Sequence, residues 1–369
     1  MPRAIHLIEP TGYSGIFQHT VALAEALAST GETVVVHTAA EHEHLPAIGF
    51  AYCPCGTWPQ RSPATTLQRT RLARHLLGPM LRHLESAAGA GDVVHLQGSL
   101  AGALSLTVVR RLHRTGARIV FSPHETFSRR GRVDAFFLAA ALRRVADVMT
   151  FSEHDVRDLA RHGVPARLSP LIIKTPRPDP TLVRAWRTRW AAEVGGQVVL
   201  FAGEIRNDKR LETLIRAAAH WPAARTLAVV GRDRNAWVGA QQVSLELGVD
   251  VKAALGYIEL NDFVAAIAAA DAVALPYAEA NQSGIAAVAR QLGTRTVGSA
   301  VGGLPELVDA SFDPGSIEQL NAELEHVLAL PPAEPHPPDA PALVQAHAPA
   351  YLLDAEPEWA ARAVSAQVA

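Results

Sequence analysis

The stretch AVALPYAEANQSGIAAVARQLGTRTVGSAV, residues 272–301, contains a complete strand–helix–strand unit. It opens with an apolar run that is typical of a buried strand, and after Gly284 it becomes rich in alanine, as a helix does. From Thr294 the β-rich pattern returns. Because two parallel strands need a long crossover between them, a helix in this place predicts a parallel sheet that is covered by helices.

The same alternation runs along the rest of the chain, and a proline-rich segment interrupts it at 170–181. This break divides an α/β fold into two doubly wound, Rossmann-like domains, with ligands expected at the carboxyl ends of the strands and in an interdomain cleft. We expect a first domain over 1–172, a second over 173–345, and a C-terminal helix within 346–369 that packs back on the first. Further strands are expected at 4–10, 33–39, 92–98, 118–125, 148–154, 197–205 and 225–231.

The composition is ordinary for a globular protein, with 49% hydrophobic and 19% charged residues among 369. The net charge of −2 argues against a nucleic-acid partner. The charge is uneven, however, because residues 1–175 carry +6 and residues 176–369 carry −8. The basic first half suits an anionic partner or peripheral contact with a membrane surface, although unequal surface charge without a partner explains it as well.

No apolar run reaches the ~18 residues that a membrane span needs, and the N-terminal run is too short for a signal peptide. We therefore expect a cytoplasmic protein. The two cysteines, Cys53 and Cys55, are too close for an ordinary disulfide, which fits a reducing compartment. No second cysteine pair is present to complete a zinc site, so no metal is expected.

Two cations follow the first strand of the second half. In FAGEIRNDKRLETLIRAA, residues 201–218, Arg206 and Lys209 lie in the turn between a strand and a helix. Two positive side chains beside a helix N-terminus can neutralise a diphosphate. Basic residues in such turns are often only solvated, but the spacing favours a binding role.

Ser283 and Gly284 open the helix of the quoted stretch, and no acid, thiol or imidazole stands in its first turns. This argues against proton transfer or nucleophilic chemistry and favours an anion held by backbone N–H groups. An ordinary serine N-cap accounts for the same residues. The two interpretations separate only if Arg206 and Lys209 lie beside this turn.

Candidates in the first half also follow strands. Gly12 and Gly15 form a glycine turn that lets a ligand approach the backbone, although a tight turn without a ligand has the same residues. His124 follows a later strand and could hydrogen-bond a transferred group, with a purely structural histidine as the alternative. Secondary candidates beside these are Glu125, His95 and Gln97.

Together these stretches resemble a retaining glycosyltransferase of the GT-B fold, in the large GT4 group, over most of residues 1–330. The resemblance implies that Arg206 and Lys209 hold the diphosphate of a nucleotide-sugar donor. It also implies that the loop of Ser283 and Gly284 gives amides to the same phosphates. The first domain would then bind the acceptor, and the second the donor.

The resemblance further implies roles for single residues. Gly15 would face the diphosphate, and His124 would lie near the donor sugar and complete a catalytic set with Arg206 and Lys209. The segment GYIELND would meet the nucleotide base near Ile258. The remaining expected contacts are Arg232, Glu279, Asn281 and Gln282 toward the donor's sugar and nucleotide, and Gly12, His95, Gln97 and Glu125 on the acceptor side.

The chain departs from the family pattern at one signature. The common E-x7-E carboxylates would stand at 281 and 289, where this sequence has Asn281 and Ala289. Charge-assisted hydrogen bonds to the donor are lost with them. A subgroup with PY…QSG in this stretch resembles the chain more closely, with Glu279 and Gln282 available for sugar contacts.

These expectations define a retaining transfer without a carboxylate nucleophile, in which cations and amides stabilise the leaving diphosphate. No D-x-D-like metal signature or resident cofactor is expected, and the donor is a substrate. The alternative is a catalytically silent homologue that binds nucleotide or scaffolds a partner. An epimerase would need further acids, and a nicotinamide dehydrogenase a complete glycine fingerprint and a ribose-binding acid.

Overall fold

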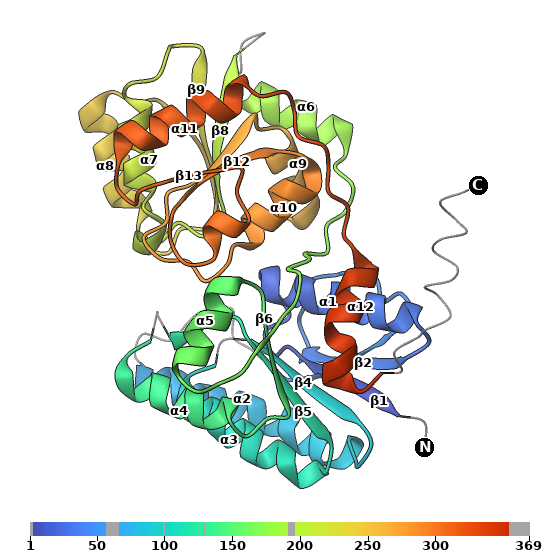
Figure 1. Cartoon of the computed structure of the whole chain (residues 1–369). Helices are drawn as coiled ribbons and strands as arrows, with labels where there is room; N and C mark the ends of the chain where they lie inside the picture. Colours follow the sequence, from blue (N-terminus) through green and yellow to red (C-terminus); the bar gives the residue numbers. More distant parts are fainter. Residues whose placement is uncertain (1–2, 57–65, 99, 128–129, 191–195, 354–369) are drawn as a thin grey trace. The chain divides into compact units, whose positions relative to one another are not determined.

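The computed structural model describes residues 3–56, 66–98, 100–127, 130–190 and 196–353, with only the backbone described for 66–76. The chain forms two compact units (Figure 1). The first comprises Met1–Lys174 together with Asp339–Ala369, and the second comprises Thr175–Pro338. The chain therefore returns to its first unit after completing the second.

The first unit is built on a parallel sheet with the strand order β3-β2-β1-β4-β5-β6-β7. The order reverses between β1 and β4, which is the switch point of a doubly wound sheet. Its strands are β1 (Ala4–Ile8), β2 (Thr33–Ala39), β3 (Ala51–Gly56), β4 (Val93–Gly98), β5 (Arg118–Pro123), β6 (Asp147–Thr150) and β7 (Arg167–Leu168).

Helices cover both faces of this sheet, and hydrophobic clusters among the described residues hold them there. One cluster contains residues of α2–α5, and another contains residues of α1 and α12. The helices are α1 (Ser14–Ser29), α2 (Thr66–Ala87), α3 (Gly102–Leu112), α4 (Arg132–Leu142), α5 (Glu153–Arg161) and α12 (Ala340–Tyr351).

The second unit repeats the design with the strand order β10-β9-β8-β11-β12-β13, again all parallel. Its strands are β8 (Gln197–Ala202), β9 (Arg225–Gly231), β10 (Val251–Leu255), β11 (Ala272–Leu275), β12 (Arg295–Ser299) and β13 (Ala310–Phe312). Its helices are α6 (Pro180–Arg189), α7 (Leu211–Ala218), α8 (Trp237–Leu247), α9 (Leu260–Ala268), α10 (Gly284–Leu292) and α11 (Ile317–Ala329).

The central strands of the second unit are buried along almost their whole length. All four residues of β11 are buried, as are five of the six in β8. A strand covered by helices on both faces has no solvated side, so its sequence is a continuous apolar run. For this reason the sequence pattern predicts both β8 and β11.

The helix that returns to the first unit begins earlier than the sequence indicates. The expected boundary was residue 346, but α12 starts at Ala340, capped by the Asp339 side chain, which accepts the Ala342 N–H at 2.8 Å. Its last residue, Tyr351, is fully buried in the first unit's core. Most of the expected 346–369 helix lies outside the described residues.

Candidate functional site

The predicted donor residues of the second unit follow the carboxyl ends of its strands, which meet at one edge of the sheet. Two glycines bring the ends of β8 and β9 together. A Cβ atom on Gly231, whose φ is +145°, would lie 1.8 Å from the carbonyl oxygen of Gly203. Because there is no room for a side chain at Gly231, only backbone atoms line this part of the carboxyl edge.

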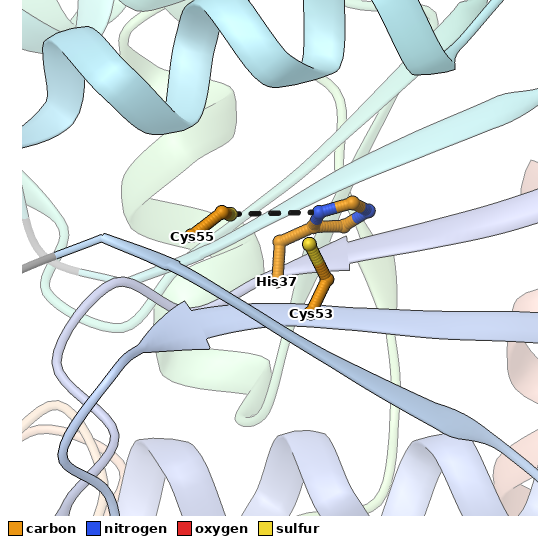
Figure 2. Close-up of side chains that lie close together, drawn as sticks. All are labelled: His37, Cys53 and Cys55. Carbon is orange, nitrogen blue, oxygen red and sulfur yellow. Dashed lines mark hydrogen bonds between the residues drawn. The ribbon is translucent and has the colours of Figure 1, made fainter.

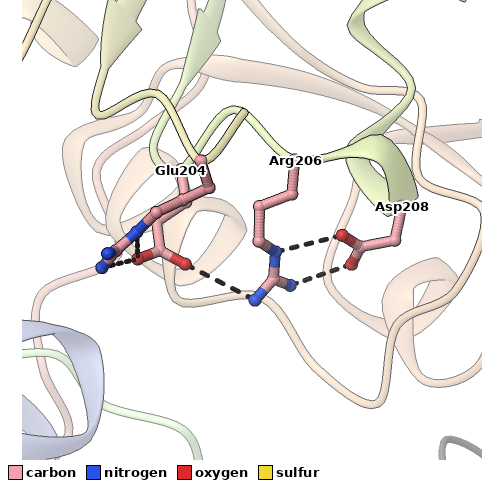
Figure 3. A network of polar contacts seen from close by, with 4 residues as sticks. Glu204, Arg206 and Asp208 are labelled. Atoms are coloured by element: carbon pink, nitrogen blue, oxygen red, sulfur yellow. Dashed lines mark hydrogen bonds and ion pairs between the residues drawn. The ribbon is translucent and has the colours of Figure 1, made fainter. Parts of the chain in front are cut away.

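Arg206 follows β8 and is held by two carboxylates (Figure 3). Its Nε and Nη2 donate to Asp208 at 3.0 and 2.9 Å, and its Nη1 lies 3.4 Å from Glu204. Glu204 also accepts two hydrogen bonds from Arg234, at 2.9 and 2.7 Å. The alternating charges fix the plane of the Arg206 guanidinium, which stays one-third exposed.

Lys209 ends the short 3-10 turn η3 (Asn207–Lys209) and lies over an aromatic ring. Its Nζ is 3.4 Å from the ring centroid of Tyr277, a side chain that is only 2% exposed. The N–H of Ala278 donates to the Asp208 carbonyl at 2.7 Å. The turn after β8 is therefore attached to the loop after β11 through both side chain and backbone.

Ser283 is the N-cap of α10, and its hydroxyl accepts the Ala286 N–H at 3.2 Å. The hydroxyl groups of Ser283 and Tyr277 also share a hydrogen bond. Burial raises the pKa of Tyr277, so its phenol is neutral. Tyr277 thus contacts Lys209 through its ring and Ser283 through its hydroxyl, which brings Arg206, Lys209 and the start of α10 into one place.

The loop before Ser283 is tightly packed. A Cβ atom on Gly302 would lie 1.5 Å from the Ala280 carbonyl oxygen, and Gly303 donates its N–H to Asn281 at 3.2 Å. Asn281 is buried at 2% exposure, and Ala289 is fully buried within α10. Of the expected sugar contacts, Gln282 is half-buried and Glu279 is exposed.

The two other donor-side candidates follow neighbouring strands. Arg232 comes directly after β9, and its carbonyl accepts the Ile205 N–H at 2.9 Å. Ile258 follows β10, the next strand along the sheet, and is half-buried. The donor candidates therefore come from consecutive strands β10, β9, β8 and β11 and share the carboxyl edge of the sheet.

In the first unit, Gly12 lies in the turn between β1 and α1, whereas Gly15, expected in the same turn, is the second residue of α1. Gly12 has a φ of +73°, and a Cβ atom there would lie 2.6 Å from that of His42. The buried carboxyl of Glu9 accepts the Gly12 N–H at 2.7 Å and the Thr11 hydroxyl at 2.5 Å. Burial raises the pKa of Glu9 to about 7.

His124 follows β5 and is buried against the rings of His19 and Phe151. Burial holds its pKa well below the usual range, so the imidazole is neutral. Its Nε2 lies 2.9 Å from the Gln97 side-chain carbonyl oxygen, and since that oxygen can only accept, Nε2 carries the proton. Glu125, the next residue, is half-buried.

His95 and Gln97 are fully buried, which does not suit the acceptor contact expected for them. His95 Nε2 lies 2.8 Å from the Ser122 hydroxyl, and its Nδ1 is hydrogen-bonded to the Tyr351 hydroxyl of α12. These bonds fasten α12 to the sheet. In this structure His95 and Gln97 help to hold His124 in position, because the Gln97 side chain is hydrogen-bonded to both histidines.

Two family models match the chain. The model for a glycosyl transferase 4-like domain matches residues 14–171, and the model for glycosyl transferases group 1 matches residues 196–329. The chain belongs to the GT4-like glycosyltransferases. A curated relative of this glycosyltransferase, the D-inositol 3-phosphate glycosyltransferase of Xylanimonas cellulosilytica, is 28% identical over 331 residues, covering 80% of the chain and 77% of the relative.

Solved structures agree on the fold of this GT4-like glycosyltransferase. The sucrose-phosphate synthase of Thermosynechococcus elongatus has a TM-score of 0.68 at 18% identity, with 99% and 97% of the two chains covered. HepE of Anabaena, crystallised with UDP and glucose, has a TM-score of 0.66 at 16% identity, with 99% and 100% covered. The fold is GT-B, with two Rossmann-like domains, as the sequence predicts.

Sequence reasoning missed one residue in each unit of this glycosyltransferase that organises the candidate residues there. Tyr277, in the second unit, stands at the end of an apolar run expected to be a strand. Glu9, in the first unit, falls within the strand expected at 4–10, whereas β1 ends at Ile8. A tyrosine after a proline at the carboxyl end of a buried strand was the available signal.

Among the described residues, no helix has the length and hydropathy of a bilayer-crossing segment.

Proposed function

We propose that this glycosyltransferase takes its sugar from a nucleoside diphosphate donor and that its second unit binds the diphosphate. The observation that carries this proposal is the contact of Tyr277 with both Lys209 and Ser283. It places a positive side chain and the N–H groups of a helix start within one cluster, which is the chemistry that a phosphate requires. HepE, which shares the fold, has been crystallised with UDP-glucose.

The proposed reaction retains the configuration at the anomeric carbon. The bond from that carbon to the diphosphate oxygen breaks while a bond to an acceptor hydroxyl forms on the same face of the sugar. The hydroxyl proton passes to the departing phosphate oxygen. Arg206, Lys209 and the amides at 283–284 stabilise the growing negative charge of the diphosphate, so the transfer needs no divalent cation.

In the first unit, we assign to His124 a hydrogen bond with the donor sugar rather than proton transfer. A general base must be able to take up a proton near the working pH, and burial lowers the pKa of this imidazole far below that range. The neutral ring offers hydrogen-bonding atoms without charge. Gln97 fixes the position of its protonated nitrogen.

The charge of the first half of the chain indicates the chemistry of the acceptor. The curated relative named above acts on an inositol phosphate, and the first half of this chain carries a positive charge that suits a phosphorylated or otherwise anionic acceptor. We therefore propose an anionic acceptor that carries a free hydroxyl group.

The test is a panel of UDP-, GDP- and ADP-sugars, each mixed with the purified chain and with inositol phosphates or simple sugar phosphates. We expect one donor to release its nucleoside diphosphate and its free nucleotide to raise the melting temperature. Proton NMR of the product reports the anomeric configuration, and added Mg²⁺ or Mn²⁺ should leave the rate unchanged. If no nucleotide shifts the melting temperature and no donor is consumed, the chain is instead a silent homologue.

A further inference from the structure

A cluster of histidine and cysteine side chains lies in the first unit, on the edge strands β2 and β3. The two strands pair in parallel with His37 opposite Cys53. Side chains two residues apart on a strand point to the same face, so Cys55 stands on the same side as Cys53. The sequence has no second cysteine pair, and strand β3 is not predicted from it. The pairing of β3 with β2 adds the imidazole of His37 to the two thiols.

The ligand atoms of these three residues lie close together (Figure 2). The Cys55 sulfur is 3.8 Å from His37 Nδ1, and the three ligand atoms all lie within 4.8 Å of one another. In a tetrahedral zinc site, with bonds of about 2.3 Å to sulfur and about 2.0 Å to nitrogen, neighbouring ligand atoms are about 3.5–3.8 Å apart. The 3.8 Å between the Cys55 sulfur and His37 Nδ1 is within about 0.3 Å of this spacing.

A second imidazole, that of His83 on helix α2, lies beside Cys53. The Nε2 atom of His83 lies 3.3 Å from the Cys53 sulfur, and the rings of His83 and His37 are 5.5 Å apart. His83 is exposed, whereas His37 is buried, so a cation would be held between a strand and a helix with its entry on the solvent side. Two thiols and two imidazoles are a standard zinc ligand set.

Residues behind the cluster hold His37 in the orientation that a metal ligand needs. His6 Nδ1 lies 2.9 Å from His37 Nε2, and the other nitrogen of His6 faces Asp92 at 3.9 Å. A proton on His37 Nε2 satisfies His6 and leaves the Nδ1 lone pair directed at the sulfur atoms. Histidine ligands are commonly fixed in this way through their second nitrogen.

The acid–base state of the cluster agrees with this arrangement. Burial, followed by His6 and His83, lowers the pKa of His37 to about 3, so it is neutral and able to donate a lone pair. Burial raises the pKa of Cys55 to about 12, with Cys53 as a further cause. The Cys55 thiol then keeps its proton until a cation displaces it.

We propose that His37, Cys53, Cys55 and His83 bind a zinc ion that joins the β2–β3 edge to helix α2. On binding, the two S–H bonds break, two zinc–thiolate bonds form, and two protons pass to solvent. A disulfide is the poorer use of this pair, since residues two apart on a strand lie about 6.6 Å apart at Cα, near the upper limit for a disulfide. The site is independent of the proposed sugar transfer.

The experiment uses the full chain, stripped of metal and titrated with zinc against a competing chelator dye. We expect one zinc per chain, about two protons released per zinc, and a thiolate charge-transfer band when Co²⁺ is the probe. Cys55→Ser should weaken zinc binding at least 100-fold, and His83→Ala at least 10-fold. His44→Ala is the matched control, because His44 is also an exposed histidine of the first unit outside the cluster, and it should bind as the wild type does.

One measurement needs no substitution. Zinc should slow alkylation of both cysteines in the wild-type chain at least tenfold, as measured by mass spectrometry of the intact protein. Alkylation at the same rate with and without zinc, or equal zinc affinity of Cys55→Ser and wild type, overturns the site. If His44→Ala loses as much affinity as His83→Ala, the assignment of the fourth ligand is overturned.

Discussion

The ammonium group of Lys209 lies 3.4 Å above the centre of the buried Tyr277 ring. A flexible lysine normally loses considerable side-chain entropy when a ligand immobilises it. Here the ring has already restricted the lysine, and the Tyr277 hydroxyl is fixed by Ser283 at the helix start. The tyrosine therefore sets the distance between the lysine and the amides that we propose as phosphate ligands.

Replacing Tyr277 separates these two contacts. Tyr277→Phe keeps the ring under Lys209 and loses only the hydrogen bond to Ser283, whereas Tyr277→Leu loses both. Because a cation–π contact is worth about 0.5–2 kcal/mol, we expect Tyr277→Leu to weaken nucleoside diphosphate binding roughly 2- to 30-fold, and Tyr277→Phe by less. Isothermal titration calorimetry measures both. Equal affinities for Tyr277→Leu and wild type would show that the ring does not position the lysine.

Substitutions of Arg206 test whether the diphosphate needs the parallel N–H donors of a guanidinium or only a positive charge. We expect Arg206→Ala and Lys209→Ala each to lower turnover at least tenfold, because each removes charge from the leaving-group site. Arg206→Lys should recover little of the lost turnover. The guanidinium donates two parallel hydrogen bonds to Asp208, and an ammonium cannot replace them. Arg216→Ala, an exposed helix arginine paired with Glu212, is the control. Near-wild-type kinetics in both alanine variants at 206 and 209 would refute the donor site.

Gly231 tests the close approach of β8 and β9. Gly231→Ala combines a φ of +145° with a Cβ atom 1.8 Å from the Gly203 carbonyl, so we expect a loss of more than about 3 kcal/mol in unfolding free energy. Gly248→Ala is the matched control, because Gly248 also has a positive φ but nothing within 4 Å of its Cβ position. It should lose only about 1 kcal/mol. Equal losses in urea denaturation would mean that backbone strain alone, without the clash, explains Gly231.

The first unit should lose stability steeply as the pH falls below about 6.5, the ordinary pKa of histidine. A histidine with a lowered folded pKa stays neutral while the unfolded chain takes up a proton, at up to about 1.4 kcal/mol per pH unit. Glu9 has the opposite effect on stability, and it involves one proton. Because its pKa is raised to about 7 in the folded chain, its contribution to stability is complete below pH 4.5 and is lost as the pH rises from 4.5 to about 7. Among the described residues, the buried histidines with lowered pKa are His6, His19, His37, His95, His124 and His347.

Scanning calorimetry between pH 5 and pH 8 measures this dependence, and one pair of variants assigns it. His347→Gln removes a buried histidine whose pKa is lowered to about 3, so it should flatten the acid slope by about one proton. His326→Gln, at an exposed position, should leave the slope unchanged. An acid slope that is the same in both variants would mean that His347 is already protonated in the folded chain.

The sequence allowed the fold to be predicted because most strands are buried on both faces. β8 and β11 appear as apolar runs, and Gly203 marks the turn after β8. Strand β3 was not predicted, because AYCPCG is a half-exposed edge strand with a proline and no continuous apolar run. Pairing register is a long-range property, so the approach of His37 to the cysteines could not be read from spacing.

The candidate donor site could be predicted only in part, for a related reason. Arg206, Lys209 and Ser283 each follow a predicted strand, and parallel strands end at a common edge. That Tyr277 lies between Lys209 and Ser283 depends on the path of the loop after β11, which Gly302 fixes from another strand. Local patterns contain no information about such a contact.

The return of the chain to its first unit sets an order for folding on the ribosome. Leu343 and Tyr351 of α12 complete the hydrophobic cluster that also contains Phe17 and Val21 of α1. During synthesis these α12 side chains emerge only after every residue of the second unit has been made. Until α12 has been synthesised, one face of the first unit's sheet therefore stays partly uncovered. The second unit can complete its fold before the first unit does.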